Sequence, residues 1–258
     1  QRYADAIWQQ EASGRVDHAY MIRDRVLPDQ IHNYAHNQEW MVRNLLHVGR
    51  VEQAIVLAKN LVELPRHPKY NTLAKRGSYQ FGRTRLFEAL AKFEQWEMLL
   101  ALAETPYLEP TDDLREQVRR LRALGVASFA TGDAARGGQM LAELERRLAD
   151  QKRQQLQAAD KAEAAAKQAK KPADQVKKAR TDAENPFKTT ITALEAALAD
   201  VRGHQALADK RYADALASFG KADGVSKELL ARVQLLAGDK AKAEETARKA
   251  VAAGKQEV

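Results

Sequence analysis

The sequence predicts an all-α protein built from repeated pairs of helices. Charged residues make up 30% of the 258 positions and hydrophobic residues 45%, whereas aromatic residues make up only 6%. The apolar share is mainly Ala and Leu, and the chain holds only 7 Pro and 13 Gly, a composition typical of helical proteins. In addition, short glycine-containing segments recur between stretches of helical periodicity, which indicates a repeat array.

The clearest internal repeat pairs GRVDHAY at 14–20 with GRVEQAI at 49–55, 35 residues further along. Both segments resemble the centre of a known helical repeat, in which a tight turn at the glycine joins the two helices of a pair. We therefore expect a first helix over 2–12, a turn at Gly14 and a second helix after that turn. Gly49 predicts the same kind of turn between the next two helices.

Two more turns are predicted where Gly-Asp follows an amphipathic stretch, at 132–133 and at 238–239. The pentapeptide RYADA also occurs twice, at 2–6 and at 211–215. The second copy is expected to open the second helix of a pair. The first copy is expected to lie in the first helix of a pair instead, because Gly14 follows it too closely for another helix to fit between.

These segments resemble the tetratricopeptide repeat (TPR) family. Gly125 follows Leu124 seven residues before Gly132, where the family has its Leu-Gly pair. A weaker copy at 92–110 has Trp96 in the aromatic position. The C-terminal copy matches the family's Tyr, Ala, aromatic and Ala positions with Tyr212, Ala215, Phe219 and Ala222.

The resemblance covers an N-terminal array over 1–145 and a C-terminal array over 187–258. It implies a right-handed superhelical solenoid of about five helix-turn-helix pairs, in which stacked pairs share one core. It also implies a scaffold or adaptor that binds a peptide or partner helix in a concave groove.

The segment 146–186 between the two arrays predicts an extended helical arm. Residues 134–171 are rich in strong helix formers, and Pro172 is expected to end that helix and start the next. Asn185-Pro186 predicts a kink or a restart. The apolar stripe is thin and predicts weak antiparallel coiled-coil pairing through Leu141, Leu144, Leu148 and Leu156. The arm is either a solvated helical hairpin or a docking element for an acidic partner or for self-association.

The family's groove positions carry over onto residues of the first helices. Alternating basic, acidic and aromatic side chains suit peptide recognition, because Arg binds carboxylates in bidentate fashion and buried aromatic rings anchor a side chain. The positions are Trp8, Glu11, His36, Glu39, Arg43, Leu46, His47, Glu88, Lys92, Arg119, Arg122 and Phe129.

An alternative is a metal or catalytic site built from histidines, because His32 and His36 lie one helical turn apart with Glu39 and His47 on the same face. However, Asn33 stands where the zinc-protease pattern requires Glu. A third hypothesis is binding of an acidic partner or nucleic acid by the arm and by the basic and aromatic segment 65–85. No nucleic-acid motif accompanies that segment, so nucleic acid is the less favoured partner.

Phosphate loops, dinucleotide-binding turns, nucleophile elbows and zinc-protease motifs are absent from the sequence, so we expect no catalysis and no cofactor. The chain has no cysteine and a net charge of +7, which permits acidic partners. It starts at Gln1 without a signal-peptide pattern, so it is expected to be a piece of a larger protein. A soluble protein of the cytoplasm or periplasm is expected, since no segment is apolar enough to span a membrane. The bias toward Ala, Arg and Gln indicates a bacterial protein.

Overall fold

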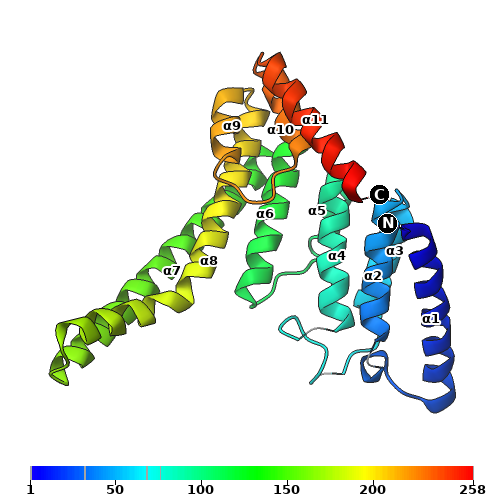
Figure 1. Cartoon of the computed structure of the whole chain (residues 1–258), viewed down its shortest axis with the longest axis horizontal. Helices are drawn as coiled ribbons and strands as arrows, with labels where there is room; N and C mark the ends of the chain where they lie inside the picture. Colours follow the sequence, from blue (N-terminus) through cyan, green and yellow to red (C-terminus); the bar gives the residue numbers. More distant parts are fainter. Residues whose placement is uncertain (1, 32, 68, 76, 258) are drawn as a thin grey trace. The chain divides into compact units, whose positions relative to one another are not determined.

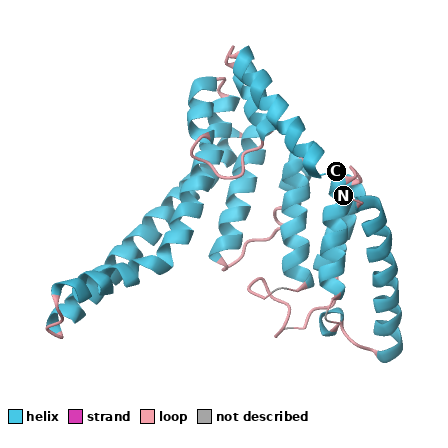
Figure 2. Cartoon of the chain, in the orientation of Figure 1, coloured by secondary structure: helices cyan, strands magenta, loops and turns pink. Residues whose placement is uncertain are grey.

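The computed structural model describes residues 2–31, 33–67, 69–75 and 77–257, with side chains described up to residue 253. Every regular element in these residues is a helix, as the composition predicts (Figure 2). In chain order they are α1 (Tyr3–Asp24), the 3₁₀ helix η1 (Pro28–Gln30), α2 (Tyr34–His47), α3 (Val51–Glu63), α4 (Ser78–Lys92), α5 (Trp96–Leu102), α6 (Leu114–Ala130), α7 (Ala134–Gln168), α8 (Ala173–Ala208), α9 (Tyr212–Phe219), α10 (Lys227–Leu236) and α11 (Lys240–Glu257).

The chain divides into two compact units. The first contains Gln1–Ala123 and Arg248–Val258, and the second contains Leu124–Ala247. The division falls inside α6 and inside α11, so each of these helices contributes to both units. The two units are described separately below.

One turn geometry recurs between consecutive helices. A residue with positive φ follows the end of the first helix, and the next residue but one begins the second helix. Gly49, Gly132 and Gly238 occupy this position with φ of 75°, 84° and 86°, as the sequence predicts. Glu94 and Lys210 occupy it with φ of 51° and 59°. In each case the following N–H donates to a carbonyl five residues back, which is the hydrogen bond of the Schellman motif.

The prediction of a turn at Gly14 is wrong. Helix α1 runs without interruption from Tyr3 to Asp24, and Gly14 lies buried in its middle. A Cβ built on Gly14 would lie 2.2 Å from Nε2 of Gln38 in α2. Gly14 therefore lets α1 and α2 approach closely. Helix α1 ends at Asp24, and its C-cap residue Arg25 has a φ of 53°.

The two RYADA segments begin helices in the same way. Arg2 and Arg211 are the N-cap residues of α1 and α9, and the tyrosine that follows each is the first helical residue. Each arginine also forms an ion pair with the aspartate three positions later. The expectation for the second copy is confirmed, since Tyr212 opens α9 directly after the turn from α8. The first copy begins α1, which continues far beyond the predicted end at residue 12.

In the first unit, α2, α3 and α4 pack side by side around a leucine-rich core (Figure 1). Leu45, Leu61, Leu86 and Leu90 are almost fully buried there. Gly82 of α4 permits the close contact with α3, because an added Cβ would lie 2.7 Å from a backbone oxygen of α3.

The interface between α1 and α2 contains several polar side chains. Asn37 donates to the Ser13 hydroxyl over 3.1 Å, and Asn44 donates to the Gln10 amide oxygen over 3.0 Å. Among the hydrophobic residues of α1, only Ile7 is buried. This helix is therefore attached more by amide hydrogen bonds than by apolar contact.

In the second unit, small residues again set the helix contacts. A Cβ on Gly203 of α8 would lie 2.4 Å from the Phe219 ring of α9, and one on Gly137 of α7 would lie 2.7 Å from the Phe129 ring of α6. Phe219 packs with Ala206, Ala215 and Val233 in one apolar cluster. Two of the C-terminal signature residues, Ala215 and Phe219, are therefore core residues, and Tyr212 packs against them.

The arm predicted from the sequence is the outer part of a long antiparallel hairpin formed by α7 and α8 (Figure 1). The first helix ends at Gln168 and Pro172 is the N-cap of the second, close to the expected positions. Asn185-Pro186 does not restart the helix, because α8 continues through Pro186. Ala159 and Ala166 are buried in the contact, whereas Leu156 is 54% exposed, so alanine rather than leucine fills the outer seam.

Candidate functional site

One face of the first unit gathers most of the groove residues expected from the sequence. On α2 it presents His36, Trp40, Arg43 and His47, which recur at spacings of three and four residues. The Arg43 guanidinium lies 4.7 Å from the Trp40 ring centroid, and the His36 ring meets the same indole edge-on at 5.7 Å. Trp40 is 42% exposed, so this cluster offers an aromatic surface flanked by positive charge.

Helix α4 continues this face next to α2. The Arg85 side chain forms ion pairs with Glu39 of α2 and with Glu88 of its own helix. Glu39 is only 4% exposed, so its carboxylate requires this partner. The Arg85–Glu39 pair therefore fixes the register between α2 and α4, and it leaves Glu88 and Lys92 at the surface.

The N-terminal part of α6 supplies the third side of the face. Arg119 donates to the Thr84 hydroxyl of α4 over 2.9 Å and pairs with Glu116 at 3.1 Å. Arg115 and Arg122 lie four residues before and three residues after Arg119, so they share its side of the helix. We call this surface the α2–α4–α6 face. It comprises His36, Trp40, Arg43, His47, Arg85, Glu88, Lys92, Arg115, Arg119 and Arg122.

The charge of this face is positive. The face contains six Lys and Arg residues. Only three Glu residues lie on it or directly beneath it. Each carboxylate is already paired with an arginine, through Glu39–Arg85, Glu88–Arg85 and Glu116–Arg119. Arg43, Lys92 and Arg115 have no carboxylate partner among the described residues, so positive charge prevails on this face and favours an anionic ligand.

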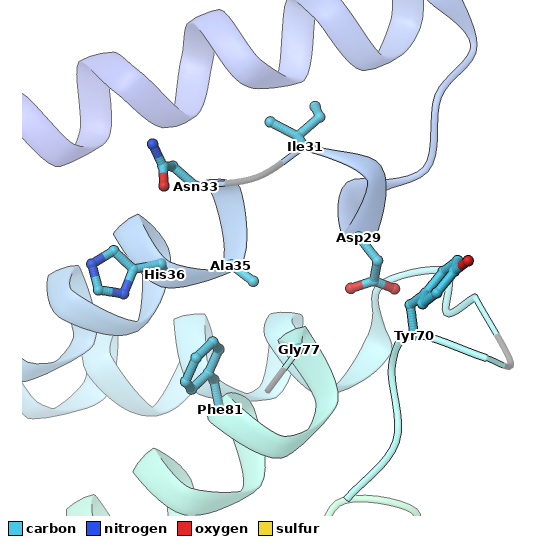
Figure 3. A pocket seen from close by; sticks show the side chains of 8 residues that line it. All are labelled: Asp29, Ile31, Asn33, Ala35, His36, Tyr70, Gly77 and Phe81. Carbon is cyan, nitrogen blue, oxygen red and sulfur yellow. The ribbon is translucent and has the colours of Figure 1, made fainter. Parts of the chain in front are cut away.

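A small pocket of about 340 Å³ opens at the end of the face where α2 and α4 begin (Figure 3). His36 and Phe81 line it from α2 and α4, Asp29 lines it from η1, and Tyr70 lines it from the loop before α4. Asp29 accepts a hydrogen bond from the His67 backbone N–H over 3.2 Å, which joins η1 to the loop after α3. The pocket therefore has a polar and aromatic wall continuous with the face.

The other expected groove residues lie elsewhere. Trp8 and Glu11 are on α1, where Trp8 is 65% exposed and Glu11 pairs with Arg15. Leu46 is buried in the core, and Phe129 is buried in the second unit against Gly137. The expectation that Leu46 and Phe129 are exposed to a ligand is therefore wrong.

Sequence reasoning missed Trp40 and Arg85. Trp40 lies four residues after His36 and three before Arg43, so the helical spacing of those two predicted residues could have identified it. Arg85 belongs to the basic and aromatic segment 65–85, but it lies on α4 and reaches across to Glu39.

The histidine cluster is only partly assembled. His32 lies outside the described residues. His47 stacks on the Tyr3 ring at 4.4 Å, His36 contacts Trp40, and Glu39 is paired with Arg85. Within the described part of the chain, no three His, Cys, Asp or Glu side chains are grouped as a metal site requires.

Only part of the basic and aromatic segment 65–85 is used inside the protein, because Lys69, Tyr70 and Lys75 are exposed. Arg83 is fully buried and donates to the backbone carbonyls of Tyr107 and Glu109 over 3.1 and 2.9 Å. Tyr79 is buried, and Arg66 lies 4.1 Å from its ring centroid. These contacts attach the start of α4 to the adjoining loops.

Comparisons of the chain with protein-family models, with curated proteins and with solved structures give no match. Among the helices described, none combines the length and apolar content that crossing a membrane requires.

Proposed function

We propose that this chain is a TPR-like protein-interaction module that binds an acidic segment of a partner protein on the α2–α4–α6 face. The proposal follows the sequence resemblance, and it is supported by the recurring helix–turn–helix geometry with glycine, or a residue in the same left-handed conformation, at each turn. In such arrays the first helix of each pair lines the concave side. Helices α2, α4 and α6 are the first helices of three successive pairs.

The observation that carries the proposal is the composition of this face. Its carboxylates are neutralised by arginines within the protein, while Arg43, Lys92 and Arg115 add positive charge without a carboxylate partner among the described residues. Trp40 provides an exposed ring among these charges. A segment rich in Asp and Glu with an aromatic or aliphatic anchor complements this arrangement, because charge complementarity orients the segment and the indole supplies apolar contact area.

The proposal is tested with a fluorescein-labelled peptide of repeated Glu-Glu-Tyr units, whose binding is followed by fluorescence anisotropy. A peptide of repeated Lys-Lys-Tyr units is the charge-reversed control. We expect the acidic peptide to bind and the basic peptide not to bind. The triple variant Arg43→Gln, Lys92→Gln, Arg115→Gln is expected to weaken binding by about tenfold or more, and Trp40→Ala by about tenfold.

A matched variant separates local recognition from overall charge. Lys221, Lys227 and Lys240 are exposed residues of the second unit, and replacing all three by Gln removes the same charge. Binding should be unchanged in that variant. Equal weakening by the two triple variants, or equal binding of the two peptides, would show that the α2–α4–α6 face is not the binding site.

A further inference from the structure

The outer end of the α7–α8 hairpin has a charge distribution unlike the rest of the arm. We divide the hairpin into a shaft, formed by residues 134–166 and 179–208, and a tip, formed by residues 167–178. The shaft contains nine Lys and Arg residues and nine Asp and Glu residues, so it is neutral. The tip contains five lysines and one aspartate, so it carries a net charge of +4.

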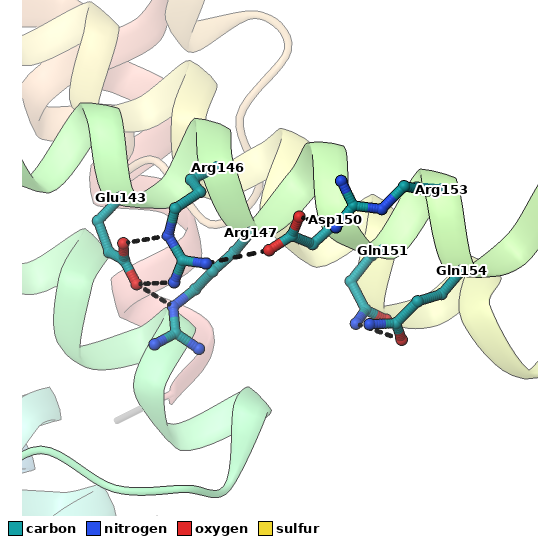
Figure 4. Close-up of polar contacts among 7 residues, drawn as sticks. All are labelled: Glu143, Arg146, Arg147, Asp150, Gln151, Arg153 and Gln154. Carbon is teal, nitrogen blue, oxygen red and sulfur yellow. Dashed lines mark hydrogen bonds and ion pairs between the residues drawn. The ribbon is translucent and has the colours of Figure 1, made fainter.

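Most charges of the shaft are paired, whereas Lys161 and Lys188 have no ion pair among the described residues. Arg146 and Arg147 both donate to Glu143, and Arg146 also pairs with Asp150 (Figure 4). Hydrogen bonds from Arg146 and Arg147 lower the pKa of Glu143. Further pairs join the two helices of the hairpin and hold them in register, namely Lys152–Glu195, Arg202–Glu145, Arg180–Asp160 and Arg180–Glu163.

The lysines of the tip are less fully paired than the charged residues of the shaft. All five are exposed. Lys167 and Lys178 pair with acidic residues one turn away in their own helices, at 2.6 Å in each case. Lys170, Lys171 and Lys177 have no ion pair among the described residues. Because the helical rise is about 1.5 Å per residue, all five lie within about 9 Å of the hairpin end along its axis.

We propose that the tip of the α7–α8 hairpin binds the anionic headgroup surface of a phospholipid bilayer. The five lysines lie on both helices and on the turn, so they form a group that approaches a flat surface end-on. Their depth of about 9 Å is comparable to the Debye length at physiological salt, so all of them interact with the surface potential. The tip has no aromatic or large exposed apolar side chain, so contact is electrostatic and without insertion.

The same features make nucleic acid the less suitable partner. The tip has no arginine to bind phosphate in bidentate fashion and no ring on which a base could stack. Lysine acts as a compact point charge on a flexible stem, which suits a diffuse surface potential. Acidic peptide binding by the α2–α4–α6 face is independent of this proposal, since that face lies in the other unit.

The test is co-sedimentation of the full chain with vesicles. Vesicles of phosphatidylcholine containing about one third phosphatidylglycerol are compared with vesicles of phosphatidylcholine alone. We expect binding only to the anionic vesicles and loss of binding at about 0.5 M salt. The triple variant Lys170→Gln, Lys171→Gln, Lys177→Gln should lower the partition coefficient about a hundredfold, since each lysine contributes about fivefold.

The matched variant Lys221→Gln, Lys227→Gln, Lys240→Gln removes the same charge from another place and should bind like the parent chain. Circular dichroism should show equal helix content in all three proteins, because the replaced lysines of the tip are exposed. Absence of binding to anionic vesicles would overturn the proposal, and so would equal loss in both triple variants. Binding of duplex DNA through the tip lysines without vesicle binding would overturn it in favour of a nucleic-acid surface.

Discussion

Replacing Gly203 by Ala tests whether the α8–α9 contact is as close as described. The added Cβ would lie 2.4, 2.5 and 2.9 Å from three carbons of the Phe219 ring. Favourable carbon–carbon contact requires about 3.5–4.0 Å, so the ring must move by about 1 Å. Phe219 is 3% exposed and packed against Ala206, Ala215 and Val233, so it has little space for this movement.

Two opposing effects set the change in unfolding free energy of the Gly203→Ala variant. Overpacking a filled core costs about 1–3 kcal/mol, whereas Ala stabilises a helix interior by about 1 kcal/mol relative to Gly. The Gly203→Ala variant should therefore lose up to about 2 kcal/mol of unfolding free energy. Gly138→Ala in α7 is the matched control, because no heavy atom lies within 4 Å of a Cβ built there. It should gain about 0.5–1 kcal/mol.

The comparison uses urea unfolding followed by far-ultraviolet circular dichroism. Since both variants make the same replacement within a helix, the difference of about 1–3 kcal/mol between them isolates the contact with Phe219. Phe219→Leu should relieve part of the loss in the Gly203→Ala background, because the smaller side chain leaves room for the methyl group. A Gly203→Ala variant that gains as much stability as Gly138→Ala would refute the close packing.

Two further predictions concern single residues. Lys210 adopts a φ of 59°, so Lys210→Gly should raise the unfolding free energy by about 0.5–1 kcal/mol in urea titrations, and a loss would contradict the left-handed conformation. Burial raises the pKa of Asp17, and its buried Oδ2 has no hydrogen-bond partner in the described structure. The folded state therefore loses stability as pH rises through the ordinary pKa of aspartate. Asp17→Asn should accordingly be more stable than the parent chain at pH 7 but not below pH of about 3, and equal stabilities at pH 7 would contradict this.

The sequence predicted those helix–helix turns that contain glycine. Gly49, Gly132 and Gly238 could be recognised because positive φ at a helix end selects glycine. Glu94 adopts the same conformation and carries no such signal. Gly14 was wrongly predicted to be a turn, because glycine also occurs where two helices pack closely. The sequence alone does not separate these two uses, since the touching residue, Gln38, lies on another helix.

The site was predicted in part for a similar reason. Helical spacing correctly placed His36, Arg43 and His47 on one side of α2. It could not show that Glu39, next to that stripe, turns inward to Arg85, because that ion pair depends on how α2 packs against α4. Whether a side chain at the edge of a helix is exposed depends on how the neighbouring helix packs against it.

The amide-rich contact between α1 and α2 affects how the protein opens. A hydrogen bond between side chains contributes about 1 kcal/mol net, because water competes for the same groups. Two such bonds, one buried isoleucine and the stacking of Tyr3 on His47 therefore hold α1 with less free energy than the 5–15 kcal/mol typical of a whole domain. We therefore expect the N-terminal helix to detach before the rest of its unit unfolds. Its amide hydrogens exchange with solvent through this local opening.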